Sequence, residues 1–247
     1  MSLRLGFDMD GVVADLNAAL VREALRLFPG IELRRPAAEQ AAAPGSSDPQ
    51  APGGDPAEST PPSLALSHRQ ERQLWDAVKG ITNFWETLDE TEPGIVSRLA
   101  TTSRARRWEV MFLTSRPQSA GDIVQVQSQR WLERFGFPLP ALYVVSTSRG
   151  RIAQALELDV VVDDRPENCL DIALDSKARA ILIWRGSESA VPASARRLGI
   201  GGVNSVEACL DLLVEADSPD STDGGIIGRL KKLLRLKSGA TTEPSRA

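Results

Sequence analysis

Two short apolar runs, each followed at once by a pair of acidic residues, constrain the fold of this 247-residue chain most. The acidic residues are Asp8 and Asp10 after residues 3–7, and Asp163 and Asp164 after the three valines at 160–162. Such runs are typical of buried parallel strands. In an open α/β sheet, ligands bind at the carboxyl ends of the strands, so we expect these carboxylates to converge there. Because converging carboxylates repel one another and lose hydration, the pattern favours a bound divalent cation such as Mg²⁺.

Strand-like and helix-like segments alternate along the rest of the chain. Further strands are predicted at residues 110–113, 142–145 and 180–184. Helices are predicted over 13–27, around 74–85, around 95–99, over 123–135 and 152–156, from Pro166 onward, and over 204–214, where Asn204 and Glu207 resemble a capping box. This alternation predicts an α/β fold, a Rossmann-like parallel sheet with helices on both faces.

Composition excludes several classes of function. A net charge of −4 and a pI of about 5.3 argue against a partner that is a nucleic acid polymer. Cys169 and Cys209 lie in apolar helical patterns and are expected in the core. The single histidine, His68, supports neither a zinc site nor a serine-protease triad. The first strand begins too early for a signal peptide and no run is long enough to span a bilayer, so we expect a cytoplasmic protein.

Two segments differ in composition from the rest of the chain. Residues 36–63 are rich in Ala, Pro, Gly, Ser and acidic residues and contain no Val, Ile, Leu or aromatic residue, so we expect a disordered insertion. The tail from Asp217 is polar except for residues 226–237, whose leucines follow helical spacing among five positive charges. Such a basic amphipathic helix binds an anionic membrane surface or a protein partner; the alternative is an appended helix that docks weakly or frays.

The first acidic pair has the chemistry of phosphoryl transfer. The Asp8 carboxylate can attack a phosphoryl group and form an aspartyl-phosphate. Asp10 can protonate the leaving alcohol and then deprotonate the water that resolves the intermediate, and Gly11 lets the backbone turn tightly. The alternative is an ordinary acidic turn. A calcium loop is excluded because Val12, Val13 and Ala19 stand where such a loop needs a ligand, a glycine and a glutamate.

Two further features are weaker on their own, and a third, the Asp163–Asp164 pair, is more informative. Thr114 and Ser115 follow a strand and can hold phosphate oxygens, although both residue types also start helices. Arg149 precedes a predicted helix and can neutralise the attacking carboxylate, although it is also compatible with a solvated loop. Asp163 and Asp164 favour metal binding, with stabilisation by the following helix dipole as the alternative.

In this order the four segments resemble the motifs of the haloacid dehalogenase-like (HAD) superfamily of phosphohydrolases. They are residues 7–12 (Phe-Asp-Met-Asp-Gly-Val), 112–117 (Phe-Leu-Thr-Ser-Arg-Pro), 149–151 (Arg-Gly-Arg) and 162–168 (Val-Asp-Asp-Arg-Pro-Glu-Asn). The resemblance implies that Asp8 is the nucleophile and a Mg²⁺ ligand, and that Asp10 is the general acid/base and gives its carbonyl to the metal. It implies that Thr114, Ser115 and Arg149 bind phosphate, and that Asp164 and also Asp163 bind the metal. Arg149 stands where the family usually has lysine, which cannot reproduce the planar guanidinium.

Within that superfamily the chain most resembles the 5′(3′)-deoxyribonucleotidase branch. The resemblance rests on the block at 8–15, on Phe84-Trp85-x-x-Leu88 before Gly94, and on the Asp-Asp-Arg-Pro sequence. It implies a catalytic core of residues 1–16 and 91–216, a small helical cap over 17–90 that contains the 36–63 insertion, and a flexible tail over 217–247. Phe84 and Trp85 either stack on a substrate base or belong to the core of the cap.

The sequence therefore predicts a Mg²⁺-dependent phosphomonoester hydrolase that forms an aspartyl-phosphate. The expected substrate is a 5′-(deoxy)nucleotide, as in deoxyribonucleotide catabolism, or a similar small phosphorylated metabolite. Dehalogenation is disfavoured because a halide needs no general acid, whereas Asp10 supplies one. Three alternatives stay open: a phosphatase for a non-nucleotide metabolite, a non-catalytic phosphate- or nucleotide-binding module, and an interaction protein that acts through residues 226–237.

Overall fold

The computed structural model describes residues 2–31, 64–186, 191–198 and 200–217, together with residues 228, 230 and 232. The segment 36–63, for which a disordered insertion is predicted, lies outside the described residues. Most of the predicted basic helix at 226–237 also lies outside them.

Six parallel strands form one sheet in the order β3-β2-β1-β4-β5-β6. The strands are β1 (Arg4–Asp8), β2 (Glu109–Thr114), β3 (Ala141–Val144), β4 (Val160–Asp163), β5 (Arg179–Ile183) and β6 (Gly201–Val203). The chain winds from β1 outward to β3 and then returns to the other side of β1 with β4. The strand order therefore reverses between β1 and β4, and the carboxyl ends of strands at such a reversal are where sheets of this kind bind ligands.

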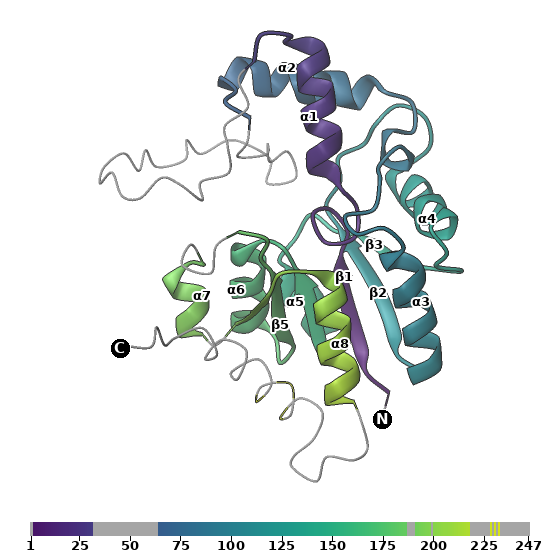
Figure 1. Ribbon diagram of the computed structural model, residues 1–247, viewed down its shortest axis with the longest axis vertical. Coiled ribbons are helices and arrows are strands. Elements are labelled where there is room, and N and C mark those ends of the chain that lie inside the picture. The colour runs from purple at the N-terminus through teal and green to yellow at the C-terminus, as the bar shows by residue number, and fades with distance from the viewer. Residues whose placement is uncertain are drawn as a thin grey trace, which may run out of the picture.

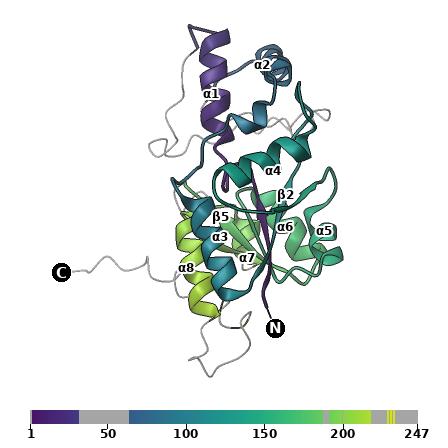
Figure 2. The ribbon, with the colours of Figure 1, turned by 90° about the vertical axis from the view of Figure 1, so that its right-hand side faces the viewer.

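Helices cover both faces of the sheet, which confirms the predicted fold class (Figure 2). The helices are α1 (Leu16–Leu27), α2 (His68–Gly80), the 3₁₀ turn η2 (Phe84–Glu86), α3 (Ile95–Arg106), α4 (Val124–Arg134), α5 (Arg149–Ala155), α6 (Pro166–Asp175), α7 (Ala193–Arg197) and α8 (Val206–Ala216). In Figure 2, α3 and α8 lie against one face, and α5 and α6 lie against the other.

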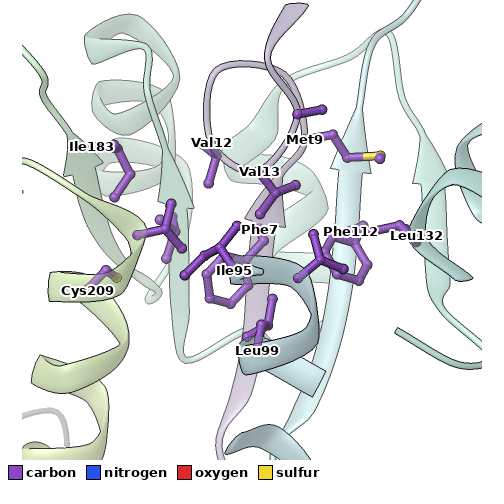
Figure 3. Packing of buried hydrophobic residues seen from close by; sticks show 14 of the residues in the cluster. Phe7, Met9, Val12, Val13, Ile95, Leu99, Phe112, Leu132, Ile183 and Cys209 are labelled. Carbon is purple, nitrogen blue, oxygen red and sulfur yellow. The ribbon is translucent and has the colours of Figure 1, made fainter. Parts of the chain in front are cut away.

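The alternating side chains of the strands build two separate apolar layers. Phe7 and Phe112 belong to the larger layer, under α3, α4 and α8, whereas Met111 and Leu113 belong to the layer under α5 and α6. Figure 3 shows the larger layer from close by, with Met9, Val12 and Val13 of the loop after β1 packed at its upper edge. The loop that follows Asp8 is therefore anchored by its own apolar side chains. Cys209 lies in this layer and Cys169 in the other, as the sequence predicts.

Helices α1 and α2 pack together beyond the carboxyl end of the sheet (Figure 1). Helix α1 starts at Asp15, whose side chain accepts a hydrogen bond from the Ala18 backbone N at 2.9 Å. Helix α2 starts with a capping box between Ser67 and Gln70, and His68 beside it is exposed. This position over the strand ends is where a cap would lie, but the division into a core of 1–16 and 91–216 and a cap over 17–90 stays a prediction.

Several local features differ from the sequence prediction. Residues 13–15 form a turn and a bridge before α1 rather than its first turn. Helix α8 is capped by Ser205, which accepts from the Ala208 backbone N, and not by an Asn204–Glu207 capping box. The Glu92 carboxylate instead accepts the first backbone N–H groups of α8, so a contact from a distant segment determines this helix start. Strand β6 has three residues, two of them glycine, and helix α7 has five, so neither is long enough to give a periodic signal.

The tail contributes one residue to the described core. Leu230 is buried in the larger apolar layer, whereas Gly228 and Lys232 are exposed, and all three have helical backbone. Burial of Leu230 fits the docking alternative for residues 226–237, and binding of a membrane surface or a partner stays a prediction. Among the described helices, none combines the length and the apolar character that crossing a bilayer requires.

Gly150 allows α5 and α6 to approach closely, which gives a first testable prediction. A Cβ added there would collide with the Asp171 carbonyl oxygen and lie 2.7 Å from the Asp175 Cβ. Gly150→Ala is therefore expected to lower the free energy of unfolding in urea by about 1–3 kcal/mol, as overpacking does. The matched control is Gly80→Ala at the end of α2, where an added Cβ meets no described atom within 4 Å. An unchanged free energy of unfolding in Gly150→Ala would contradict the close packing of α5 and α6.

Candidate functional site

The sheet brings the acidic pairs and the Thr-Ser pair to one edge. Strands β2, β1 and β4 are neighbours, with Asp8 paired to Leu113 and Phe7 paired to Val162 in register. Their last residues are Thr114, Asp8 and Asp163, all of them buried. Ser115 follows directly and is half-buried. The candidate site therefore lies at the point where the strand order reverses.

A tight loop after β1 carries the second aspartate of the first pair. The backbone N–H groups of Val13 and Ala14 both donate to the Met9 carbonyl, at 2.9 and 2.8 Å. Gly11 has a φ of +81°, and a Cβ added there would collide with the Asp164 carboxylate. Glycine is thus required for the turn and for the close approach of the β4 end.

Arg185, to which the sequence assigned no role, binds the backbone of this loop. Its guanidinium donates to the carbonyl oxygens of Gly11 and Val12 and to the Glu92 carboxylate, the last at 3.0 Å. The Thr91 backbone N–H donates to the Val13 carbonyl at 3.0 Å. The loop geometry therefore depends on segments that are remote in sequence and lack any motif.

Arg149 is the first residue of α5 rather than a loop residue before it. Ser148 caps the helix, because its side chain accepts from the Arg151 backbone N at 3.1 Å. The buried guanidinium donates through Nη2 to Asp8 Oδ1 at 2.6 Å, and its Nε lies 3.9 Å from Asp163 Oδ2. Its Nη1 is buried with no hydrogen-bond partner among the described residues. The alternative of a solvated loop arginine is therefore wrong.

The two aspartates after β4 have different surroundings. The buried Asp163 carboxylate accepts from the Arg165 backbone N at 2.9 Å and from Asn168 Nδ2 at 3.0 and 3.1 Å. It thus holds the start of α6, where Pro166 occupies the first turn as predicted. Asp164 instead lies half-buried against Gly11 of the first loop. Asp164 thus faces the loop at Gly11, whereas Asp163 adjoins Asp8 beside the Arg149 guanidinium that both approach.

Asp10 is bound by a residue to which the sequence assigned no role. Arg116 donates through Nε to both carboxylate oxygens, at 3.0 and 2.8 Å, and through Nη2 to Oδ1 at 2.7 Å. The Thr114 hydroxyl also donates to Asp10 Oδ2 at 3.4 Å. Arg116 stands inside the predicted 112–117 motif, directly after Thr114 and Ser115, and this position is the signal that could have identified it.

Phe84 and Trp85 are both buried, at 3% and 1% exposure. Their rings pack edge to face at 5.0 Å, and Trp85 Nε1 donates to the Pro117 carbonyl at 3.0 Å. The Arg116 guanidinium lies 4.8 Å from the centre of the Trp85 ring. Rings covered in this way favour the core-packing alternative over stacking on a substrate base.

Burial and mutual repulsion raise the proton affinity of the acidic cluster. Burial, followed by the charge of Asp163, raises the pKa of Asp8 well above its usual value, although Arg149 opposes this. Burial raises the pKa of Asp163 to about 6, with Arg149 again opposing. Burial, then the charges of Asp8 and Asp10, raises the pKa of Asp164 to about 7. These carboxyls are therefore close enough together for a positive charge between them to be favourable.

The residues present fit a magnesium ion of the kind that the resemblance implies. Within the described ranges, no three His, Cys, Asp or Glu side chains are grouped to hold a metal. Mg²⁺ does not require three, because it commonly keeps several waters and binds one or two carboxylates. Asp8 and Asp164 supply two carboxylates, of which the first raises the pKa of the second, and the Asp10 carbonyl is a third oxygen. The buried Asp163 is already occupied by Arg165 and Asn168 and suits an indirect role.

The raised pKa values predict how the metal-free protein responds to pH. The folded-state pKa values of Asp163 and Asp164 lie above the unfolded value, so the stability that their protonated forms provide is lost as pH rises through about 6 to 7. In EDTA, the melting temperature is expected to fall by at least about 2 °C between roughly pH 5 and pH 8. Mg²⁺ should reduce this fall, and Asp164→Asn should flatten it. If the melting temperature of Asp164→Asn fell with pH as steeply as that of the wild type, the raised pKa of Asp164 would be contradicted.

Comparison with known proteins supports the fold. No family model and no curated protein matches the sequence. Among solved structures, the chain is similar to a candidate beta-phosphoglucomutase from Thermotoga maritima, with a TM-score of 0.50 and 16% identity over 86% of this chain and 99% of that chain. At this identity the likeness shows the fold alone, and it agrees with the α/β fold and parallel sheet that the sequence predicts. It lends no support to the finer resemblance to the deoxyribonucleotidase branch.

Proposed function

We propose that this protein is a magnesium-dependent phosphomonoester hydrolase that acts through an aspartyl-phosphate on Asp8. One observation carries the proposal: the buried Arg149 guanidinium donates to Asp8 at 2.6 Å and retains a buried donor, Nη1, without a partner among the described residues. A buried donor left unsatisfied is destabilising by about 1–3 kcal/mol. An unsatisfied donor beside the proposed nucleophile suits an anion that binds there, and a phosphoryl oxygen has the required charge and geometry.

The first chemical step is in-line attack by an Asp8 oxygen on phosphorus. A bond forms between this oxygen and phosphorus, and the bond between phosphorus and the ester oxygen breaks. The leaving oxygen takes a proton from the carboxylic acid form of Asp10, which leaves an alcohol and the Asp10 carboxylate. Arg149 stabilises the negative charge that develops on the phosphoryl oxygens, since its Nη1 is available to them.

The second step releases phosphate. The Asp10 carboxylate takes a proton from a water molecule whose oxygen attacks the phosphorus of the aspartyl-phosphate. The bond between phosphorus and the Asp8 oxygen then breaks, and both carboxyl groups return to their starting states. The side chain of Asp10 is 18% exposed, so water can reach it at this edge of the sheet.

Asp8, Asp164 and the Asp10 carbonyl would hold the metal ion. When bound, Mg²⁺ supplies charge neutralisation and helps to orient a phosphoryl group between Asp8 and Arg149. Thr114 and Ser115 border the same strand ends and would contribute donors to the phosphate. The buried Thr114 hydroxyl is shared with Asp10, which favours Ser115 as the freer donor.

The proposed substrate class is a small phosphorylated metabolite. Helices α1 and α2 beyond the strand ends would limit the size of a ligand there (Figure 1). A 5′-(deoxy)nucleotide is our first candidate, by resemblance alone, and a base would have to bind without Phe84 and Trp85 because both rings are buried. The cytoplasmic location expected from the sequence also stays a proposal.

Phosphate release from a panel of nucleoside monophosphates, sugar phosphates and p-nitrophenyl phosphate tests the function. We expect release with Mg²⁺, loss of release in EDTA, and a fall of at least about 10³-fold in Asp8→Asn, which cannot form the covalent intermediate. Asp15→Asn is the matched control, because Asp15 caps α1 and lies outside the proposed chemistry. A folded protein that binds Mg²⁺ and releases phosphate from none of these substrates would contradict the proposal and favour a phosphate-binding module.

Arg149 gives a second prediction for the same site. Arg149→Gln is expected to lower kcat/KM by about 10²- to 10³-fold, the usual effect of losing one donor to a developing charge. It should also weaken inhibition by inorganic phosphate, and Arg149→Lys should retain more activity because it keeps the charge. The matched control is Arg151→Gln, an exposed arginine in the same helix. Unchanged phosphate inhibition in a folded Arg149→Gln protein would exclude a phosphate-binding role.

A further inference from the structure

The Arg116 side chain is a fully buried cation whose charge is matched by one carboxylate. It has no exposed side-chain surface, and its three contacts with Asp10 lie between 2.7 and 3.0 Å. Burying a guanidinium is unfavourable unless it is paired and hydrogen-bonded. The pairing with Asp10 is therefore a fixed part of the structure, unlike the exposed ion pairs at the surface.

The rest of the guanidinium is held as firmly as the part that binds Asp10. Nη1 donates to the buried Ser128 hydroxyl of α4 at 2.8 Å. The Trp85 ring covers one face of the group at 4.8 Å, and Trp85 is itself fixed by hydrogen bonds to the Pro117 carbonyl and to Gln127. Contacts from three segments thus leave Arg116 a single orientation, and a planar group held in this way fixes the carboxylate that binds it.

Of the two paired side chains, only Asp10 is accessible to solvent. The Asp10 side chain retains 18% exposure, whereas that of Arg116 has none. Arg116 therefore touches neither solvent nor the space in which a phosphoryl group would lie against Asp8 and Arg149. Arg116 thus contacts the site through Asp10. Its charge also lowers the pKa of Asp8, an effect that Arg116→Lys retains, so this substitution tests the contact rather than the charge.

We propose that Arg116 is a positioning residue that holds the Asp10 carboxylate in the orientation from which it takes the proton of the attacking water. The inference rests on the proposed function. A misdirected carboxylate slows the second step, because water attacks the aspartyl-phosphate without a base. The first step is much less affected when the leaving group is p-nitrophenolate, which departs without protonation. Loss of Arg116 should therefore let the aspartyl-phosphate accumulate.

Rapid-mixing kinetics of Arg116→Lys with p-nitrophenyl phosphate and Mg²⁺ test this role. Lysine keeps the charge but cannot form the planar contact with both carboxylate oxygens. We expect a burst of about one p-nitrophenolate per active site, then a steady-state kcat lowered by about 10- to 100-fold, within the range that general base catalysis provides. KM should fall with kcat, because the covalent intermediate accumulates. Circular dichroism and the melting temperature show whether Arg116→Lys is folded. If Arg116→Lys is unfolded, Arg116→Gln, which keeps an amide donor, is measured in its place.

Two comparisons exclude a merely structural role. Arg134→Lys replaces an arginine that lies over the Phe135 ring, also at 4.8 Å, away from the acidic cluster, and should leave the kinetics unchanged. In an Asp10→Asn background, Arg116→Lys should add little to the loss, since both substitutions disable the same base. Three results would overturn the positioning role even if the wild type is an active phosphatase. They are additive losses in the double variant, a lowered kcat without a burst in Arg116→Lys, and wild-type kinetics in Arg116→Lys. Absence of phosphatase activity in the wild type would overturn the proposed function, and the positioning role with it.

Discussion

Compensation of buried carboxylates by buried guanidinium groups is the interaction on which this site depends. Asp8 and Asp163 share Arg149, and Asp10 is paired with Arg116. Without these cations, the desolvation and repulsion that already raise the pKa of Asp8 would act unopposed. The compensation is incomplete, because the pKa values of Asp163 and Asp164 remain raised, to about 6 and about 7. A site that holds its acids partly neutralised is suited to accept one further divalent cation.

The topology of the sheet makes this concentration of charge possible. Strand β1 lies between β2 and β4, so the carboxyl ends of three strands that are far apart in sequence meet at one edge. Apolar layers on both faces fix these ends, and Met9, Val12 and Val13 extend the larger layer up to the loop itself (Figure 3). The positions of the carboxylates are thus determined by packing of the core rather than by a flexible loop, as chemistry at a fixed phosphorus atom requires.

The features that follow from local pattern were predictable, and those that depend on contacts between distant side chains were not. Apolar runs that end in Asp8 and Asp163 identified the strands, because burial on both faces leaves a continuous signal. Arg149 was expected near the site, but its place inside α5 depends on the Ser148 cap. Arg116 and Arg185 carry no periodic signal, since a guanidinium reaches its partner across the fold. Burial of Trp85 follows from η2 packing on α4, which no spacing in the sequence encodes.

The unequal surroundings of the adjacent Asp163 and Asp164 show how one dipeptide serves both fold and site. Successive residues at a strand end point in different directions, so one carboxylate can turn back to the helix start while the other faces the neighbouring loop. Asp163 takes the first role through Arg165 and Asn168, and Asp164 takes the second against Gly11. Because a Cβ at position 11 would displace Asp164, the glycine of the first motif and the second aspartate of the last motif depend on each other. The motifs therefore form one structural unit, and neither could change alone without altering the electrostatics around Asp8.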